Sequence, residues 1–161
     1  MQAFCDFDGT ISKDDVTDLI LERFALPQWR DIEEEWVEGH ITSAECMRRQ
    51  MALVRTTLRD LDELLDGVEI DPGFASFKSF CDANDIRLTI VSDGVDYFIK
   101  RILTKRGMSG IEVIANTLIA RCPRQDRPAS LLRSRLPVHS AKPARVYASV
   151  PLWLGGVTTS M

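Results

Sequence analysis

The chain has 161 residues, of which 45% are hydrophobic and 27% are charged, with a formal net charge of −4; this is the composition of a soluble globular protein that can bury a substantial apolar core. No apolar run approaches the roughly 20 residues that a membrane-spanning helix needs, and Met1 is not followed by the basic region of a signal peptide, so we expect a cytoplasmic protein. The four cysteines are scattered without a CxxC pair or a histidine at ligand spacing, which argues against a zinc site.

The first predicted element is a short buried strand at the amino terminus. Residues 3–5 form an apolar run, and Asp6-Phe7-Asp8-Gly9 then turns the chain, because Asp-Gly pairs break extended structure. Residues two apart in a strand face the same side, so Asp6 and Asp8 can point into one cleft. At the carboxyl end of the first strand of a parallel sheet, they would lie where such folds bind ligands.

Two carboxylates this close repel each other unless a cation binds them or one is protonated. Mg²⁺ is the natural ion, because it takes carboxylates, phosphate oxygens and waters as ligands. Gly9 would let backbone amides approach a phosphate, and Thr10 adds a hydroxyl. A solvated Asp-Gly turn is the alternative for this segment. An EF-hand is excluded, because Ile11 and Thr17 stand where its glycine and its bidentate glutamate belong.

Residues 13 to about 66 are predicted to be helical throughout, in four helices. The first is expected over about 13–25, where apolar residues recur at helical spacing. Gly39 is placed to end the second helix. Side chains typical of N-caps or first turns mark the four starts: Ser12 with Asp15, Pro27, Thr42 with Glu45, and Thr57 with Asp60.

Helices and strands alternate in the next segment. Asp71-Pro72 suits the start of a helix. Residues 86–91 are rich in β-branched side chains and predict a central parallel strand, which ends at Ser92-Asp93-Gly94. A helix closed by Gly107 and a strand over 111–115 are expected to follow. This alternation predicts a doubly wound α/β sheet.

The pattern dissolves beyond residue 118. Residues 1–120 carry 13 basic and 23 acidic side chains, whereas residues 121–161 carry 7 basic and 1 acidic side chain and five of the seven prolines. Periodicity allows only a short helix around Leu131 to Leu136. The arginines of this segment are too irregular and too short of aromatic neighbours to indicate nucleic-acid binding.

Two segments match motifs of a known enzyme family. Asp6-Phe7-Asp8-Gly9-Thr10 matches the DxDGT motif of the haloacid dehalogenase superfamily, and residues 90–94 resemble its second motif, an apolar strand that ends in Ser or Thr. The helical block between them resembles the C1 cap of the phosphoserine-phosphatase-like subclass IB. Residues 14–18 and 36–46 resemble more narrowly the methionine-salvage branch, the 2-hydroxy-3-keto-5-methylthiopentenyl-1-phosphate phosphatases. The resemblance covers roughly residues 1–118.

The resemblance implies a parallel α/β core of the Rossmann type that carries an inserted helical cap. The core would comprise residues 1–12 and 70–120, and the cap residues 13–69. Residues 121–161 are expected to form a divergent or frame-shifted tail, poorly ordered, which would leave the core incomplete at the carboxyl terminus.

The resemblance also implies a phosphatase mechanism. In this family the first aspartate attacks phosphorus, so Asp6 would be the nucleophile that forms an aspartyl-phosphate, and Asp8 would be the general acid and base. Both carboxylates would bind Mg²⁺, and the substrate would be a small phosphorylated metabolite. The transferring phosphoryl group needs positioning and charge neutralisation. Its expected ligands are Thr10, Ser92, Asp93, Gly94 and Lys142.

The tail departs from the family pattern. A working member needs a lysine that neutralises the aspartyl-phosphate and a late acidic motif, GDGxxD. Lys142 lies at a plausible distance for the lysine, but Asp126 is the one acidic residue after residue 120 and no Gly-Asp pair follows it. Two hypotheses therefore stand: a magnesium-dependent phosphatase, and a catalytically inactive fragment that at most binds phosphate or a partner. The sequence does not indicate an oligomeric state.

Overall fold

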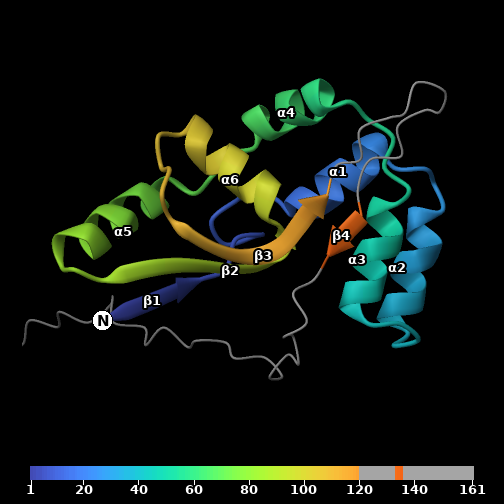
Figure 1. Ribbon diagram of the computed structural model, residues 1–161, viewed down its shortest axis with the longest axis horizontal. Helices are drawn as coiled ribbons and strands as arrows, with labels where there is room; N and C mark the ends of the chain where they lie inside the picture. Colours follow the sequence, from blue (N-terminus) through green and yellow to red (C-terminus); the bar gives the residue numbers. More distant parts are fainter. Residues whose placement is uncertain (120–132, 136–161) are drawn as a thin grey trace, which may run out of the picture.

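The computed structural model describes residues 1–119 and 133–135 (Figure 1). These residues form a four-stranded sheet in the order β1-β2-β3-β4. The first three strands are parallel, and β4 runs antiparallel to β3. The strands are β1 (Gln2–Cys5), β2 (Arg87–Val95), β3 (Glu112–Ile119) and β4 (Arg133–Arg135). The predicted α/β fold with a parallel sheet is confirmed; the predicted incompleteness of its core after residue 120 concerns residues outside the described ones.

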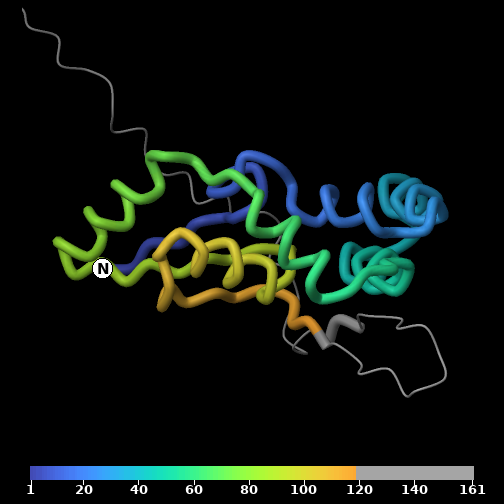
Figure 2. Tube along the Cα trace, turned by 90° about the horizontal axis from the view of Figure 1, so that it is seen from above, coloured from blue at the N-terminus to red at the C-terminus, as the bar shows by residue number. Residues whose placement is uncertain are grey.

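Six helices accompany the sheet in the described residues. Four of them lie between β1 and β2 in the sequence and precede α5, and α6 connects β2 to β3. Figures 1 and 2 place α2 and α3 beside each other at one end of the molecule and α5 at the other. The helices are α1 (Val16–Phe24), α2 (Trp29–Val37), α3 (Ser43–Met51), α4 (Leu58–Gly67), α5 (Pro72–Ala83) and α6 (Asp96–Lys105). Within the described residues, no helix combines the length and the apolar character needed to cross a membrane.

Most of the predicted helix starts are confirmed, and two are not. Thr42, Thr57 and Asp71 each accept a backbone N–H of the first turn, as N-caps do. The helix predicted from residue 13 begins at Val16 instead, with Asp15 as its N-cap. Pro27 precedes α2 rather than lying in its first turn, since the helix begins at Trp29.

Ser12 is not a cap because its hydroxyl is used inside the protein. The side chain is buried and donates hydrogen bonds to the carbonyl oxygens of Phe7, at 3.1 Å, and of Asp14, at 2.8 Å. Phe7 O belongs to the turn that follows β1 and Asp14 O to the segment leading into α1, so the hydroxyl joins that turn to this segment. A capping box and this arrangement look the same in sequence.

Two strand predictions were also too short, and one predicted helix is wrong. β2 continues through Ser92-Asp93-Gly94 to Val95, and β3 continues to Ile119. Residues 133–135 form β4, which pairs with residues 117–119 of β3, where a short helix was predicted. Pairing with the edge of β3 supplies backbone hydrogen bonds that no local sequence pattern announces.

The two ends of the helical block from α1 to α4 lie side by side. Ser12 forms a bridge with Ile70, and Lys13 N donates to Glu69 O at 3.1 Å. The Lys13 and Glu69 side chains form an exposed ion pair. The helical block therefore leaves and rejoins the sheet region at one place, as an inserted unit must.

The apolar core lies between one face of the sheet and the helices. Ile90 of β2 and Phe98 of α6 are fully buried members of this core. The alternation along the strands places Phe4, Val91 and Ile114 on the other face, where they are 52%, 42% and 51% exposed. In the described residues, the helices thus cover one face of the sheet more completely than the other.

Candidate active site

The turn after β1 is built around one backbone carbonyl. The amides of Thr10, Ile11 and Ser12 all donate to Phe7 O, at 3.2, 2.8 and 3.0 Å. Gly9 has a φ of +65°, a conformation that glycine adopts without steric cost. The Phe7 side chain is fully buried and anchors the turn, whereas its two acidic neighbours remain accessible to solvent.

Asp8 is held by two elements besides its own turn. Its Oδ2 accepts a hydrogen bond from Ser92 Oγ of β2 at 3.0 Å, and its Oδ1 accepts one from the backbone amide of Val16, the first residue of α1, at 3.0 Å. The amino terminus of a helix favours negative charge. The structure thus joins two segments 84 residues apart in sequence, at the place where the parallel strands end.

The end of β2 forms a tight loop against Asp8. Gly94 N donates to Ser92 Oγ at 2.8 Å, and both residues are buried. A Cβ on Gly94 would lie 2.7 Å from Asp8 Oδ2 and 3.0 Å from Ser92 Oγ, closer than side-chain carbons approach such atoms. Only glycine fits this position without displacing Asp8 or Ser92.

The pKa of Asp8 is raised above its ordinary value of 3.8. Burial is the largest cause, and the negative charges of Asp15 and Asp6 act in the same direction. The hydrogen bonds from Val16 N and Ser92 Oγ oppose the shift. A carboxyl group with a raised pKa keeps its proton to a higher pH than an ordinary aspartate, which is what a general acid requires.

Asp6 and Asp8 provide carboxylate oxygens, a ligand type that Mg²⁺ takes. The effect of the Asp6 charge on the pKa of Asp8 places the two carboxylates within electrostatic reach of each other. No group of three or more His, Cys, Asp or Glu side chains that could hold a metal occurs among residues 1–119 and 133–135. Mg²⁺ is commonly bound by one or two carboxylates together with substrate phosphate and water, so this pair suits it.

The other predicted site residues are less fully placed. Thr10 is exposed in the turn after β1, and Asp93 is exposed near the end of β2, where its carbonyl accepts a hydrogen bond from the side chain of Asn116. Lys142 lies outside the described residues. The structure therefore brings Asp8, Ser92 and Gly94 into direct contact. It also adds Asn116, a residue that the sequence did not single out.

A second layer of acidic side chains approaches the site from the helices. The pKa of Asp18 on α1 is raised to about 6, first by burial and then by the charges of Asp15, Glu33, Glu22 and Asp8. The hydrogen bond from Gln50 Nε2 joins Glu33 of α2 to α3. The negative charges of α1 and α2 therefore act on Asp18 together with that of Asp8.

This crowding of charge predicts a pH-dependent effect of Asp18→Asn. Because the pKa of Asp18 is higher in the folded than in the unfolded protein, the unfolding free energy falls as the pH rises from the unfolded pKa, near 4, through the folded pKa, about 6. The Asn variant does not titrate, so it should gain up to about 1 kcal/mol in unfolding free energy at pH 7.5, a value reduced for the exposure of Asp18. Denaturant unfolding at pH 4 and pH 7.5 measures this difference. An equal effect at both pH values would contradict it.

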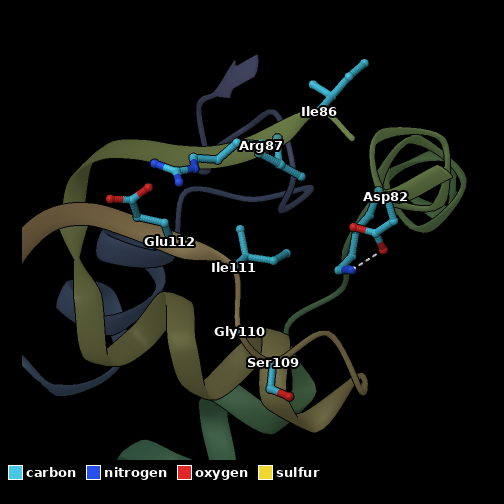
Figure 3. Close-up of a pocket in the computed structure, with 9 residues that line it drawn as sticks. Asp82, Ile86, Arg87, Ser109, Gly110, Ile111 and Glu112 are labelled. Carbon is cyan, nitrogen blue, oxygen red and sulfur yellow. Dashed lines mark hydrogen bonds and ion pairs between the residues drawn. The ribbon is translucent and has the colours of Figure 1, made fainter. Parts of the chain in front are cut away.

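A cavity of about 300 Å³ opens at the opposite end of the sheet (Figure 3). Its lining combines apolar residues with charged ones, among them Lys78 and Asp82, which form an ion pair at 2.6 Å, and Arg87. From Arg87 to Ser92 the strand advances roughly 16 Å, at about 3.3 Å per residue. The cavity is therefore not part of the site around Asp8.

Comparisons with known proteins identify related sequences. A profile of the haloacid dehalogenase-like hydrolase family matches residues 3–150. A 2-hydroxy-3-keto-5-methylthiopentenyl-1-phosphate phosphatase of Brevibacillus brevis is 34% identical over 115 residues, which are 70% of this chain and 52% of the relative. A phosphatase of the same name from Geobacillus thermodenitrificans is 33% identical over 102 residues, 62% of this chain and 46% of the relative. The chain thus spans about half the length of the curated relatives it matches.

Solved structures share the fold. A HAD family hydrolase from Salmonella enterica serovar Typhi matches with a TM-score of 0.66 at 22% identity, over 84% of this chain and 45% of that chain. A phosphoserine phosphatase, solved as an analogue of the phospho-aspartyl intermediate, matches with a TM-score of 0.61 at 17% identity, over 83% of this chain and 62% of that chain. The family match also continues beyond residue 118 to residue 150, so the resemblance is longer than the one expected from the motifs and includes the position of Lys142.

Proposed function

The chain belongs to the haloacid dehalogenase-like hydrolase family, and on that basis we propose that it is a magnesium-dependent phosphatase of small phosphorylated metabolites, acting through an aspartyl-phosphate. The observation that carries the proposal is the hydrogen bond of 3.0 Å between Ser92 Oγ and Asp8 Oδ2. It joins the two sequence motifs into one site, at which the pKa of Asp8 is raised.

Asp6 and Asp8 divide the chemistry between them. An Asp6 carboxylate oxygen attacks phosphorus while the bond from phosphorus to the leaving oxygen breaks, and Asp8 gives its proton to that oxygen. Water then attacks the phosphorus of the aspartyl-phosphate, with Asp8 accepting the proton. Inorganic phosphate leaves, and the Asp6 carboxylate is restored. Asp6 suits the role of nucleophile because it is exposed, and Asp8 suits the role of general acid and base because its pKa is raised.

The phosphoryl group is held by residues of both loops in this proposal. Thr10 and Ser92 supply hydroxyls, and the Asp93 and Gly94 segment supplies backbone amides. Without substrate, the Ser92 hydroxyl donates to Asp8. To bind the phosphate, it has to rotate away from Asp8. Lys142 supplies the neutralising cation. Mg²⁺, held by the Asp6 carboxylate beside Asp8, would supply charge neutralisation at the phosphoryl oxygens.

The helical block is proposed to select the substrate. Residues 13–69 contain α1 to α4 and act as a cap on a core formed by residues 1–12 and 70–120. The relatives from Brevibacillus brevis and Geobacillus thermodenitrificans are named for 2-hydroxy-3-keto-5-methylthiopentenyl-1-phosphate, an intermediate of methionine salvage. We assign the same substrate class to this chain.

Release of inorganic phosphate tests the proposal. The purified chain is offered a panel of small phosphate esters that includes phosphoserine and the methylthio-ketopentenyl phosphate, with Mg²⁺ and with EDTA. We expect turnover on the order of 1 s⁻¹ on the preferred ester, which EDTA abolishes. Folded protein that releases no phosphate above the blank would refute catalysis and leave a family member that at most binds phosphate or a partner.

A further inference from the structure

One peptide group at the end of β2 is clamped at both of its polar atoms. The carbonyl oxygen of Asp93 accepts a hydrogen bond from Asn116 Nδ2 at 2.5 Å, and the amide of Gly94 donates to Ser92 Oγ at 2.8 Å. These two groups belong to the same planar peptide and point in opposite directions. Asn116 therefore controls the tilt of the plane that carries the Gly94 N–H.

The clamp continues to the proposed acid and base. Because Ser92 Oγ accepts the Gly94 N–H, its own hydrogen is directed to Asp8 Oδ2, 3.0 Å away. The hydrogen bonds thus run without interruption from the Asn116 amide through the peptide and the Ser92 hydroxyl to the Asp8 carboxylate. Linked hydrogen bonds of this kind polarise and strengthen one another.

Asn116 stands at the place where the strands fall out of register. Val91 pairs with Ile114, but Val95 pairs with Asn116, so four residues of β2 advance against two of β3. The surplus residues form the loop that contains Ser92 and Gly94. Bulges re-aim side chains and are common beside active sites.

We propose that Asn116 is a positioning residue of the active site, which orients the Asp93–Gly94 peptide and thereby directs the Ser92 hydroxyl and the Gly94 amide. Asn116 as a residue is 7% exposed and its side-chain amide donates to the Asp93 carbonyl, so we assign it positioning rather than contact with substrate. The catalytic part of this inference rests on the proposed phosphatase function. The simpler explanation is that the Asn116 side chain only supports the fold by donating to the Asp93 carbonyl.

Asn116→Ala and the volume-filling Asn116→Leu separate these explanations. The matched control is Asn84→Ala, because Asn84 Nδ2 also donates to a backbone carbonyl, Phe80 O, at 2.8 Å, but at the end of α5. Amide hydrogen exchange at Gly94 is measured without substrate, with Ile102 of α6 as the internal reference. Both Asn116 variants should raise the Gly94 exchange rate about five- to tenfold relative to Ile102, and Asn84→Ala should leave it unchanged.

Kinetics provide the second readout. Loss of positioning should lower kcat about 10- to 100-fold with KM nearly unchanged. The reason is that the contacts of Ser92 and Gly94 with the phosphoryl group are stronger in the transition state than in the bound substrate. Unchanged Gly94 exchange overturns the inference, and so does faster exchange with kcat equal to that of Asn84→Ala. If the wild-type chain releases no phosphate, the proposed function fails separately. The exchange measurement then decides alone whether Asn116 orients the loop.

Discussion

Replacing Asp6 by Asn is expected to reduce magnesium-dependent phosphate release by about 10⁴-fold or more, as loss of a covalent nucleophile does in other enzymes. The amide oxygen is a poor nucleophile and lacks the charge that binds the metal. The fold should survive, because the Phe7 N–H that donates to Asp6 Oδ1 at 2.7 Å can donate equally to an amide oxygen. Initial rates on the preferred ester measure the loss, and thermal unfolding measures the stability.

Asp85→Asn is the matched control for this substitution. Asp85 is exposed and lies in the turn before β2, at the opposite end of the strand from Ser92. Its φ is +53°, a conformation that asparagine tolerates as well as aspartate. The control should keep wild-type activity. If Asp6→Asn released phosphate at a rate close to that of Asp85→Asn, Asp6 could not be the nucleophile.

The central part of the candidate site was predictable because it depends on local rules. Asp6 and Asp8 flank the buried Phe7 directly after β1, which ends at Cys5, and an apolar strand that leads to Ser92 belongs at the same edge of a parallel sheet. The contact between Ser92 and Asp8 follows from these two facts. The roles of these residues, and that of Lys142, stay predictions until kinetics are measured.

The residues that escaped prediction act through contacts that no short sequence pattern encodes. Ser12 has the spacing of an N-cap, but the turn around Phe7 O draws its hydroxyl inward, and Asp15 caps α1 instead. Asn116 gains its partner only because β2 and β3 are out of register by two residues. The edge of β3 pairs with β4, in a segment whose composition favours neither helix nor strand. Tertiary contacts decide each of these cases.

Gly94→Ala should nearly abolish activity, although alanine adds one methyl group. Its Cβ would lie 2.7 Å from Asp8 Oδ2 and 3.0 Å from Ser92 Oγ, so at least one of these atoms must move. Asp8 cannot shift freely, because Val16 N and Ser92 Oγ hold its two oxygens. We expect kcat to fall by about 100-fold or more, and the free energy of unfolding to fall by about 1–3 kcal/mol.

Gly67→Ala tests whether this effect belongs to the position or to the loss of a glycine. Gly67 ends α4, and a Cβ there would meet nothing within 4 Å. That variant should keep full activity and equal or slightly greater stability, since alanine restricts the unfolded chain. The loss of activity in Gly94→Ala is then caused by the added methyl group between Asp8 and Ser92, and not by the loss of a glycine as such. Wild-type kcat in Gly94→Ala would mean that Asp8 and Ser92 can move apart without loss of activity. Their hydrogen bond would then not be required for catalysis.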